Sequence, residues 1–190
     1  IIETNTFSAN RISQSEYGCE DFAGMMAYEG ARLAREAADC YMKSTGRKVW
    51  VAGSIGPTSK SLSLSPDASD PAYRPYSFDQ MQEAYREQAE ALLRGGADLI
   101  LIETCFDALN VKAALDGIQD IIQERLNDGT GILPSPARGR GPAMLGEGLW
   151  SQQPLLNDDS IPVIISVSVG DRSGRTLTGQ TLEAFYTSVC

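Results

Sequence analysis

Histidine is absent from the 190 residues of this sequence. This absence excludes imidazole metal ligands, histidine acids and bases, and Ser-His-Asp triads within the chain. No C-x-x-C pair occurs either, because the four cysteines stand far apart at positions 19, 40, 105 and 190. Disulfide scaffolds are shorter and richer in cysteine, so we expect free thiols and a cytoplasmic protein.

Basic residues are also scarce, with 16 Lys and Arg against 25 Asp and Glu and a formal net charge of -9. Such a surface repels phosphate backbones and anionic lipids, so we expect neither nucleic acid nor a membrane as a partner. No apolar run approaches the roughly 18 residues of a membrane span, and the first residues do not resemble a signal peptide. The chain begins without Met inside a strand-like run, which we interpret as the start of a fragment.

Short apolar runs alternate with long amphipathic segments along most of the sequence. The pattern predicts strands over residues 1–4, 49–52, 99–102 and 163–168. It predicts helices over 21–42, 108–126 and 181–189. It also predicts a helix that begins with the capping-box spacing at 77–80 and is ended by Gly95. We expect loops up to Gly18 and over 58–76. This order is typical of an α/β fold with a parallel sheet, and periodicity alone leaves open whether the sheet is flat or closed into a barrel.

Residues 129–160 interrupt this alternation. They are rich in Pro and Gly and show neither the helical nor the strand period. We therefore predict one domain over residues 1–190, with a flexible insertion at about 129–160.

Polar residues follow the predicted strands, at the end of the sheet where parallel α/β folds bind ligands. Glu103 directly follows four apolar residues, so its burial requires a cationic partner such as the amino group of an amino acid, or a salt bridge or helix cap. Asn5 and Thr6 follow the first strand, and they suit either a ligand or a turn. Cys105 lies two residues beyond Glu103, but one thiolate does not make a zinc site.

Five stretches of this sequence resemble the homocysteine S-methyltransferase family, and within it the homocysteine-binding domain of cobalamin-dependent methionine synthases. They are Thr4-Asn5-Thr6-Phe7, residues 51–58, the Ser-Pro-Asp loop at 62–67, residues 95–104, and Gly-Arg-Thr-Leu-Thr-Gly-Gln-Thr at 174–181. The resemblance covers nearly the whole chain except 129–160. The Ser-Pro-Asp loop and the 174–181 segment favour the methionine synthase branch.

The resemblance implies a partial (β/α)8 TIM barrel of about four consecutive βα units, corresponding to family strands two to five. A complete barrel needs roughly 250 residues. In the implied site, Glu103 accepts the substrate ammonium, and Asn5, Thr6 and Ser54 line the same pocket. The implied reaction transfers a methyl group to the homocysteine thiol and forms methionine.

The same resemblance implies zinc in the complete domain and methylcobalamin on another module, replenished from methyltetrahydrofolate. Those cobalamin- and methyltetrahydrofolate-binding modules would be partners of this chain. The family's zinc cysteines belong to later strands, so we expect no metal ligands in this chain and no activity from it alone. Three alternatives stay open: a truncated product that only binds a ligand or partner, a betaine- or S-methylmethionine-dependent homocysteine methyltransferase, and an unrelated lyase or isomerase with Glu103 as base.

Overall fold

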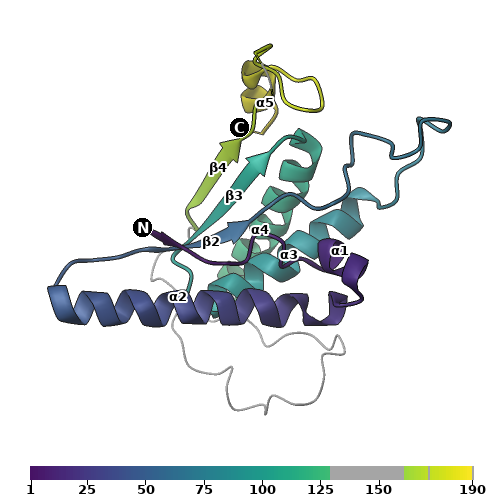
Figure 1. The fold of residues 1–190 in the computed structure, drawn as a ribbon. Helices are drawn as coiled ribbons and strands as arrows, with labels where there is room; N and C mark the ends of the chain where they lie inside the picture. The colour runs from purple at the N-terminus through teal and green to yellow at the C-terminus, as the bar shows by residue number, and fades with distance from the viewer. Residues whose placement is uncertain (129–160, 171, 190) are drawn as a thin grey trace.

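Four parallel strands and the helices between them form the core of the molecule. The computed structural model describes residues 1–128, 161–170 and 172–189. The strands pair in the order β1-β2-β3-β4, the same as their order along the chain (Figure 1). They are β1 (Ile2–Glu3), β2 (Val51–Ile55), β3 (Leu99–Cys105) and β4 (Val163–Val167). The larger helices are α2 (Ala23–Thr45), α3 (Phe78–Arg94), α4 (Ala108–Asp128) and α5 (Leu182–Val189). Four consecutive βα units are therefore present, which confirms the predicted α/β class.

The helix ends follow from local sequence. The Ser77 hydroxyl accepts the backbone N–H of Gln80 while the Gln80 side chain accepts that of Ser77, so the predicted capping box starts α3. Gly46 ends α2 in the left-handed conformation, with φ 69°, which glycine adopts without a side-chain penalty. Both helices thus begin or end where the sequence indicated.

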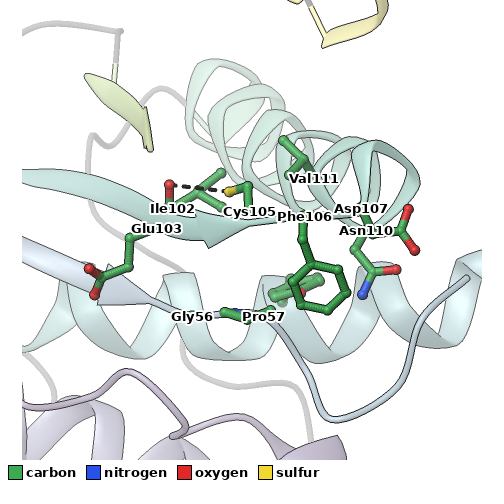
Figure 2. A pocket seen from close by; sticks show the side chains of 10 residues that line it. Gly56, Pro57, Ile102, Glu103, Cys105, Phe106, Asp107, Asn110 and Val111 are labelled. Carbon is green, nitrogen blue, oxygen red and sulfur yellow. Dashed lines mark hydrogen bonds between the residues drawn. The ribbon is translucent and has the colours of Figure 1, made fainter. Parts of the chain in front are cut away.

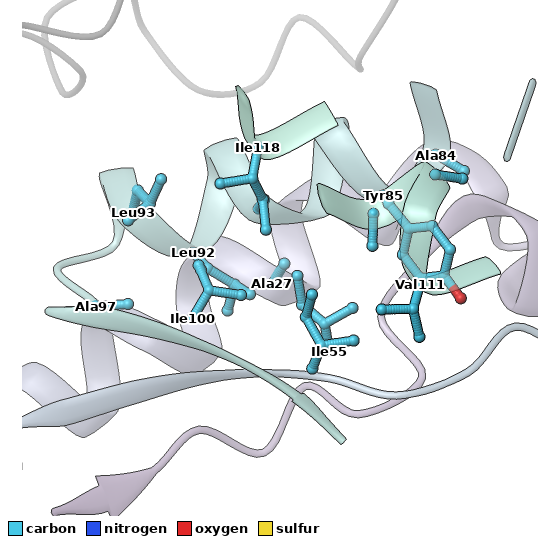
Figure 3. Close-up of a cluster of buried hydrophobic side chains, with 14 of the residues drawn as sticks. Ala27, Ile55, Ala84, Tyr85, Leu92, Leu93, Ala97, Ile100, Val111 and Ile118 are labelled. Carbon is cyan, nitrogen blue, oxygen red and sulfur yellow. The ribbon is translucent and has the colours of Figure 1, made fainter. Parts of the chain in front are cut away.

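The hydrophobic core lies between the sheet and helices α2, α3 and α4. Ala27 of α2, Ile55 of β2 and Leu92 of α3 are fully buried in it, and Ile100 of β3 joins them (Figure 3). Each large apolar side chain buried in this way contributes roughly 1.5–3 kcal/mol. This packing holds the strands in register and so fixes the positions of their carboxyl ends.

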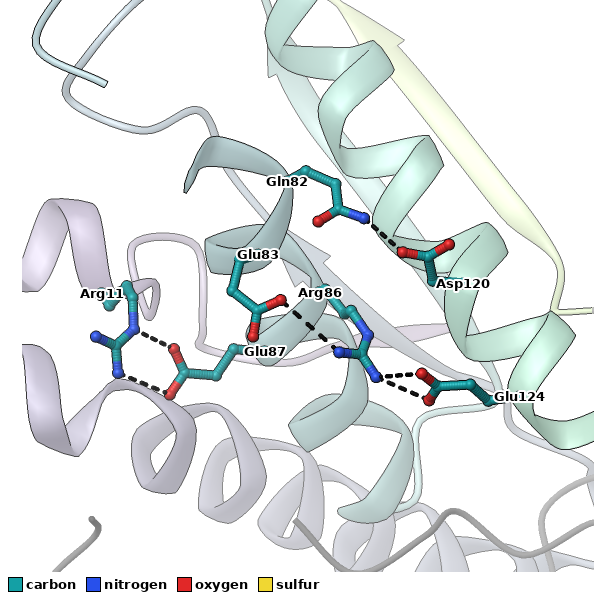
Figure 4. A network of polar contacts seen from close by, with 7 residues as sticks. All are labelled: Arg11, Gln82, Glu83, Arg86, Glu87, Asp120 and Glu124. Atoms are coloured by element: carbon teal, nitrogen blue, oxygen red, sulfur yellow. Dashed lines mark hydrogen bonds and ion pairs between the residues drawn. The ribbon is translucent and has the colours of Figure 1, made fainter. Parts of the chain in front are cut away.

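A second set of contacts joins the helices on their outer side. Arg11 of the short helix α1 (Arg11–Gln14) pairs with Glu87 of α3 at 2.6 Å, and Arg86 of α3 pairs with Glu124 of α4 at 2.7 Å (Figure 4). These side chains are partly exposed, and such pairs contribute about 0–1 kcal/mol each. They fix how neighbouring helices align, while the buried apolar contacts supply most of the stability.

Two sequence predictions need correction. The segment before Gly18 is predicted to be a loop, but it contains α1 and one 3-10 turn, η1 (Ser15–Tyr17); a second turn, η2 (Glu20–Phe22), follows Gly18 and precedes α2. Helix α1 begins at Arg11 because the buried Asn10 side chain accepts the backbone N–H of Ser13. Strand β2 lies two to three residues later than predicted, because Gly53 is part of the strand, not its end. A Cβ at Gly53 would lie 3.1 Å from Leu92, so a glycine lets α3 pack closely on β2.

The inner face of the sheet, opposite the helices, carries the side chains that alternate with the core residues. The parallel register places Glu3 beside Ala52, and Leu101 beside both Ser54 and Ile164. Ile164 is 44% exposed, since none of the described helices covers this face. In a (β/α)8 barrel this face is the interior.

The predicted insertion at 129–160 lies outside the described residues. Among the helices that the structure describes, none combines the length and the apolar character that crossing a bilayer requires.

Candidate functional site

Three neighbouring strands bring polar side chains together on the inner face near its carboxyl end. The hydroxyl of Ser54, on β2, donates a hydrogen bond of 2.5 Å to the carboxylate of Glu103, on β3. Ser54 is completely buried, whereas Glu103 is partly exposed. The structure thus joins two of the four site residues predicted from the sequence, across 49 positions of the chain.

A second carboxylate, Glu3 of β1, completes this cluster. Desolvation raises the pKa of Glu3, and the hydrogen bond and negative charge of Glu103 raise it further, while a hydrogen bond from Ser54 partly opposes them. Two carboxylates that interact in this way bind a cation favourably, because the cation relieves their repulsion. Glu3 was not among the site residues predicted from the sequence, although its position at the end of the first strand could have placed it near Glu103.

Thr6 lies beside the cluster but on the side of the helices. Its hydroxyl donates to the backbone oxygen of Ser54 at 2.7 Å, and its methyl group would lie 2.5 Å from a Cβ at Gly30 of α2. The adjoining Thr4 hydroxyl accepts the backbone N–H of Ser54 at 2.9 Å. These contacts make Thr6 a support for Ser54 in this structure, and a direct contact with substrate stays a prediction.

Asn5 follows β1 and is exposed to solvent. The chain therefore leaves its amide accessible near the end of the strand that carries Glu3. The structure brings Ser54 and Glu103 into contact and leaves Asn5 outside that contact.

Cys105 does not share the inner face with Glu103. The two side chains point in different directions from β3, and the Cys105 thiol donates to the backbone oxygen of Ile102 at 3.4 Å (Figure 2). Burial raises the pKa of Cys105 to about 12, and the charge of Glu103 adds to this effect. The thiol is therefore protonated near neutral pH and a poor metal ligand or nucleophile.

A small hollow lies beside the cluster, between the segments that follow β2 and β3. Its empty space, about 230 Å³, includes open solvent, and its lining includes Pro57, Glu103, Phe106 and Asn110 (Figure 2). Apolar and polar groups thus line this hollow together, with the Glu103 carboxylate directed away from Phe106 and Asn110.

The buried carboxylate of Asp107 anchors the long loop over residues 58–76. It accepts the hydroxyls of Ser61 at 2.5 Å and Ser63 at 2.6 Å, and the backbone N–H of Leu109 at 2.9 Å. Burial alone would raise the pKa of Asp107, but these hydrogen bonds outweigh it and lower the pKa below its ordinary value. The loop is thereby fastened to the start of α4.

Arg74 holds the same loop together from inside. Its guanidinium donates to the backbone oxygens of Leu62 at 2.7 Å and Ser63 at 3.0 Å, and also to those of Pro71 and Tyr73. A fork of donors that satisfies several carbonyls stabilises one loop conformation. This loop was identified from composition alone, and the residues that organise it were not predicted.

The described residues do not form a zinc site. Among residues 1–128, 161–170 and 172–189, no three Asp, Glu, Cys or His side chains lie close enough together to hold a metal ion. Cys105 faces the core with a protonated thiol, so it offers no thiolate ligand. We therefore derive no chemical step through zinc from these residues.

The fold and this arrangement define a partial (β/α)8 barrel with a polar site at the carboxyl ends of its strands. The model of the family described as homocysteine S-methyltransferase matches residues 1–190. The chain belongs to the homocysteine S-methyltransferase family, as the sequence motifs predicted.

Two solved structures are similar to this chain, both of the homocysteine methyltransferase MmuM from Escherichia coli. The oxidized form is 24% identical with a TM-score of 0.49, and the match covers 62% of this chain and 41% of that one. The metallated form is 20% identical with a TM-score of 0.48 and the same coverages of 62% and 41%. The chain thus spans less than half the length of these enzymes.

Proposed function

We propose that this chain is the homocysteine-binding part of a methyltransferase that moves a methyl group to the homocysteine thiol and forms methionine. The hydrogen bond between Ser54 and Glu103 carries the proposal. It fixes a carboxylate at the carboxyl end of the sheet, on the face that becomes the interior of a barrel. Family membership supplies the substrate class.

In the proposed complex, Glu103 and Glu3 accept the ammonium group of homocysteine. The two carboxylates interact with each other, so a bound cation is favoured there over a neutral head group. Ser54 holds Glu103 in place, and Asn5 and Thr6 line the adjoining edge. The described residues thereby orient the amino acid, and the thiol at its far end takes the methyl group.

We further propose that the enzyme is of the methionine synthase type, with methylcobalamin on a separate module as donor. Two segments support this branch, and both contact the connection between β3 and α4. Ser61 and Ser63, from the loop with the Ser-Pro-Asp motif, bind Asp107, and Thr178 of the 174–181 segment donates to the backbone oxygen of Phe106 at 2.8 Å. Zinc, methyltetrahydrofolate and a cytoplasmic location belong to the same proposal for the whole enzyme, and the zinc ligands would be residues other than those described.

Titration calorimetry with L-homocysteine tests the binding role. The wild-type protein is expected to bind, and Glu103→Gln is expected to weaken binding ten- to a hundredfold, since a hydrogen bond to a charged group is worth about 1.5–3 kcal/mol. Glu36→Gln, at an exposed position on α2, is the matched control and should leave the affinity unchanged. A wild-type protein that binds no homocysteine, or a Glu103→Gln variant with unchanged affinity, would contradict the proposal.

A further inference from the structure

Near Glu103, strand β3 contains one residue more than the stretch of β4 that pairs with it. Ile102 pairs with Ile165, and the next pair is Cys105 with Val167. Three steps along β3 therefore match two steps along β4, which is a β-bulge. The sheet resumes beyond it, because the backbone N–H of Ser168 donates to the oxygen of Cys105 at 2.8 Å.

Thr104 occupies the bulge in an unusual backbone conformation. Its φ is 59°, and among the described residues it is the one non-glycine residue with a positive φ. A β-branched side chain is disfavoured in this left-handed region by roughly 1–2 kcal/mol. Such a conformation persists where the surrounding structure enforces it, and it is most frequent at functional sites.

The bulge changes which way the following side chain points. In a regular strand, Glu103 and Cys105 would lie on the same face, since side chains alternate with a period of two. Here Glu103 contacts Ser54 on the inner face, while Cys105 is 4% exposed and packs in the core. The extra residue between them accounts for this separation.

We propose that Thr104 is a positioning residue whose left-handed conformation holds Glu103 toward Ser54 and turns the Cys105 thiol into the core. This arrangement would also keep the Cys105 thiol out of a site that binds the thiol of homocysteine, and that consequence rests on the proposed function. If Thr104 became extended, the alternation would bring the Cys105 thiol to the inner face beside the carboxylate.

Two substitutions at Thr104 separate the outcomes. Glycine adopts the left-handed conformation freely, so Thr104→Gly should slow alkylation of Cys105 by iodoacetamide and raise the melting temperature. Proline cannot adopt a positive φ, so Thr104→Pro has to leave the left-handed conformation and should speed alkylation at least about tenfold. The rate is measured on the Cys105 peptide by mass spectrometry.

A core variant controls for general loss of stability. Ile118→Val removes one methylene from a buried residue of α4, and it should lower the melting temperature without speeding the alkylation of Cys105. The inference is overturned if Thr104→Gly is alkylated faster than wild type, or if a folded Thr104→Pro is alkylated at the wild-type rate. The Gly variant decides the question even where the Pro variant does not fold.

Homocysteine affinity supplies a separate readout. Thr104→Gly should keep it and Thr104→Pro should lose at least about tenfold, because Glu103 is no longer held. If alkylation follows the expected pattern while no variant, wild type included, binds homocysteine, the role of Thr104 stands and the proposed function fails. If homocysteine binds equally to all variants, the positioning of Glu103 by Thr104 is refuted.

Discussion

The Ser54 hydroxyl and the Glu103 carboxylate, from adjacent strands, meet at 2.5 Å on the inner face of the sheet. Ser54 is fully buried, and the hydroxyls of Thr4 and Thr6 bind its backbone N–H and oxygen. The backbone that carries the Ser54 side chain is therefore held by residues other than Glu103. Ser54 in turn holds the Glu103 carboxylate at the carboxyl end of the strands.

Ser54→Ala should weaken homocysteine binding about tenfold while the protein stays folded. The change removes one hydrogen bond to a carboxylate, which is worth about 1.5–3 kcal/mol. Calorimetric titration measures the affinity, and thermal unfolding verifies the fold. Ser44→Ala, at an exposed site near the end of α2, is the control. Unchanged affinity in Ser54→Ala would show that this hydrogen bond does not position the substrate.

Binding of homocysteine should release a proton in mildly acidic solution. The pKa of Glu3 is raised by desolvation and by Glu103, so part of Glu3 is protonated there in the free protein. An ammonium ion favours the charged carboxylate, so affinity should rise with pH through the raised pKa of Glu3. Calorimetry at about pH 5 in buffers of different ionisation enthalpy measures the proton release. Glu3→Gln should abolish it, and wild-type binding without proton release would refute this role of Glu3.

Asp107 should make the protein sensitive to acid. Its pKa is lower folded than unfolded, so it stabilises the fold above its ordinary pKa and loses this effect as pH falls through the lowered value. Asp107→Asn should cost about 1.5–3 kcal/mol at neutral pH, because its hydrogen bonds from Ser61, Ser63 and Leu109 are charge-assisted. Chemical denaturation at neutral pH and near pH 3 measures both effects. A difference between variant and wild type that does not shrink in acid would contradict this account.

Gly95→Ala should destabilise the protein by about 1–3 kcal/mol through overpacking. A Cβ at Gly95 would clash with the backbone oxygen of Tyr28, so α2 and the end of α3 would have to separate. Gly170→Ala is the control, since no atom of the described residues lies within 4 Å of a Cβ there. Equal melting temperatures for the two variants would show that the close approach of α2 is not needed.

Much of the fold follows from periodic patterns that are local in the sequence. The capping box at Ser77, the stop at Gly46 and the continuous apolar run at 99–102 each predict an element within a few residues. The position of β2 was less predictable, because Gly53 is a turn signal by composition. Its pairing with Ile100 of β3 makes that glycine part of a strand, and Leu92 packs closely against it.

The candidate site was predictable in part for the same reason. Glu103 stands out because a carboxylate ends an apolar run, and Ser54 follows from the motif that surrounds it. Glu3 and the bulge at Thr104 depend on which residues of neighbouring strands pair, and pairing is a property of the assembled sheet. The turn of the Cys105 side chain into the core likewise appears only when the register is known.

The most direct test of the account compares L-homocysteine with 4-mercaptobutanoate, which has the same thiol and carboxylate but no amino group. Calorimetry on the wild-type protein and on Glu103→Gln gives four affinities. Losing the amino group should weaken wild-type binding at least about tenfold and should have a clearly smaller effect in Glu103→Gln, where Glu3 alone remains to accept the ammonium group. Equal binding of both ligands by the wild-type protein, or an undiminished amino-group preference in Glu103→Gln, would contradict the proposed role of Glu103.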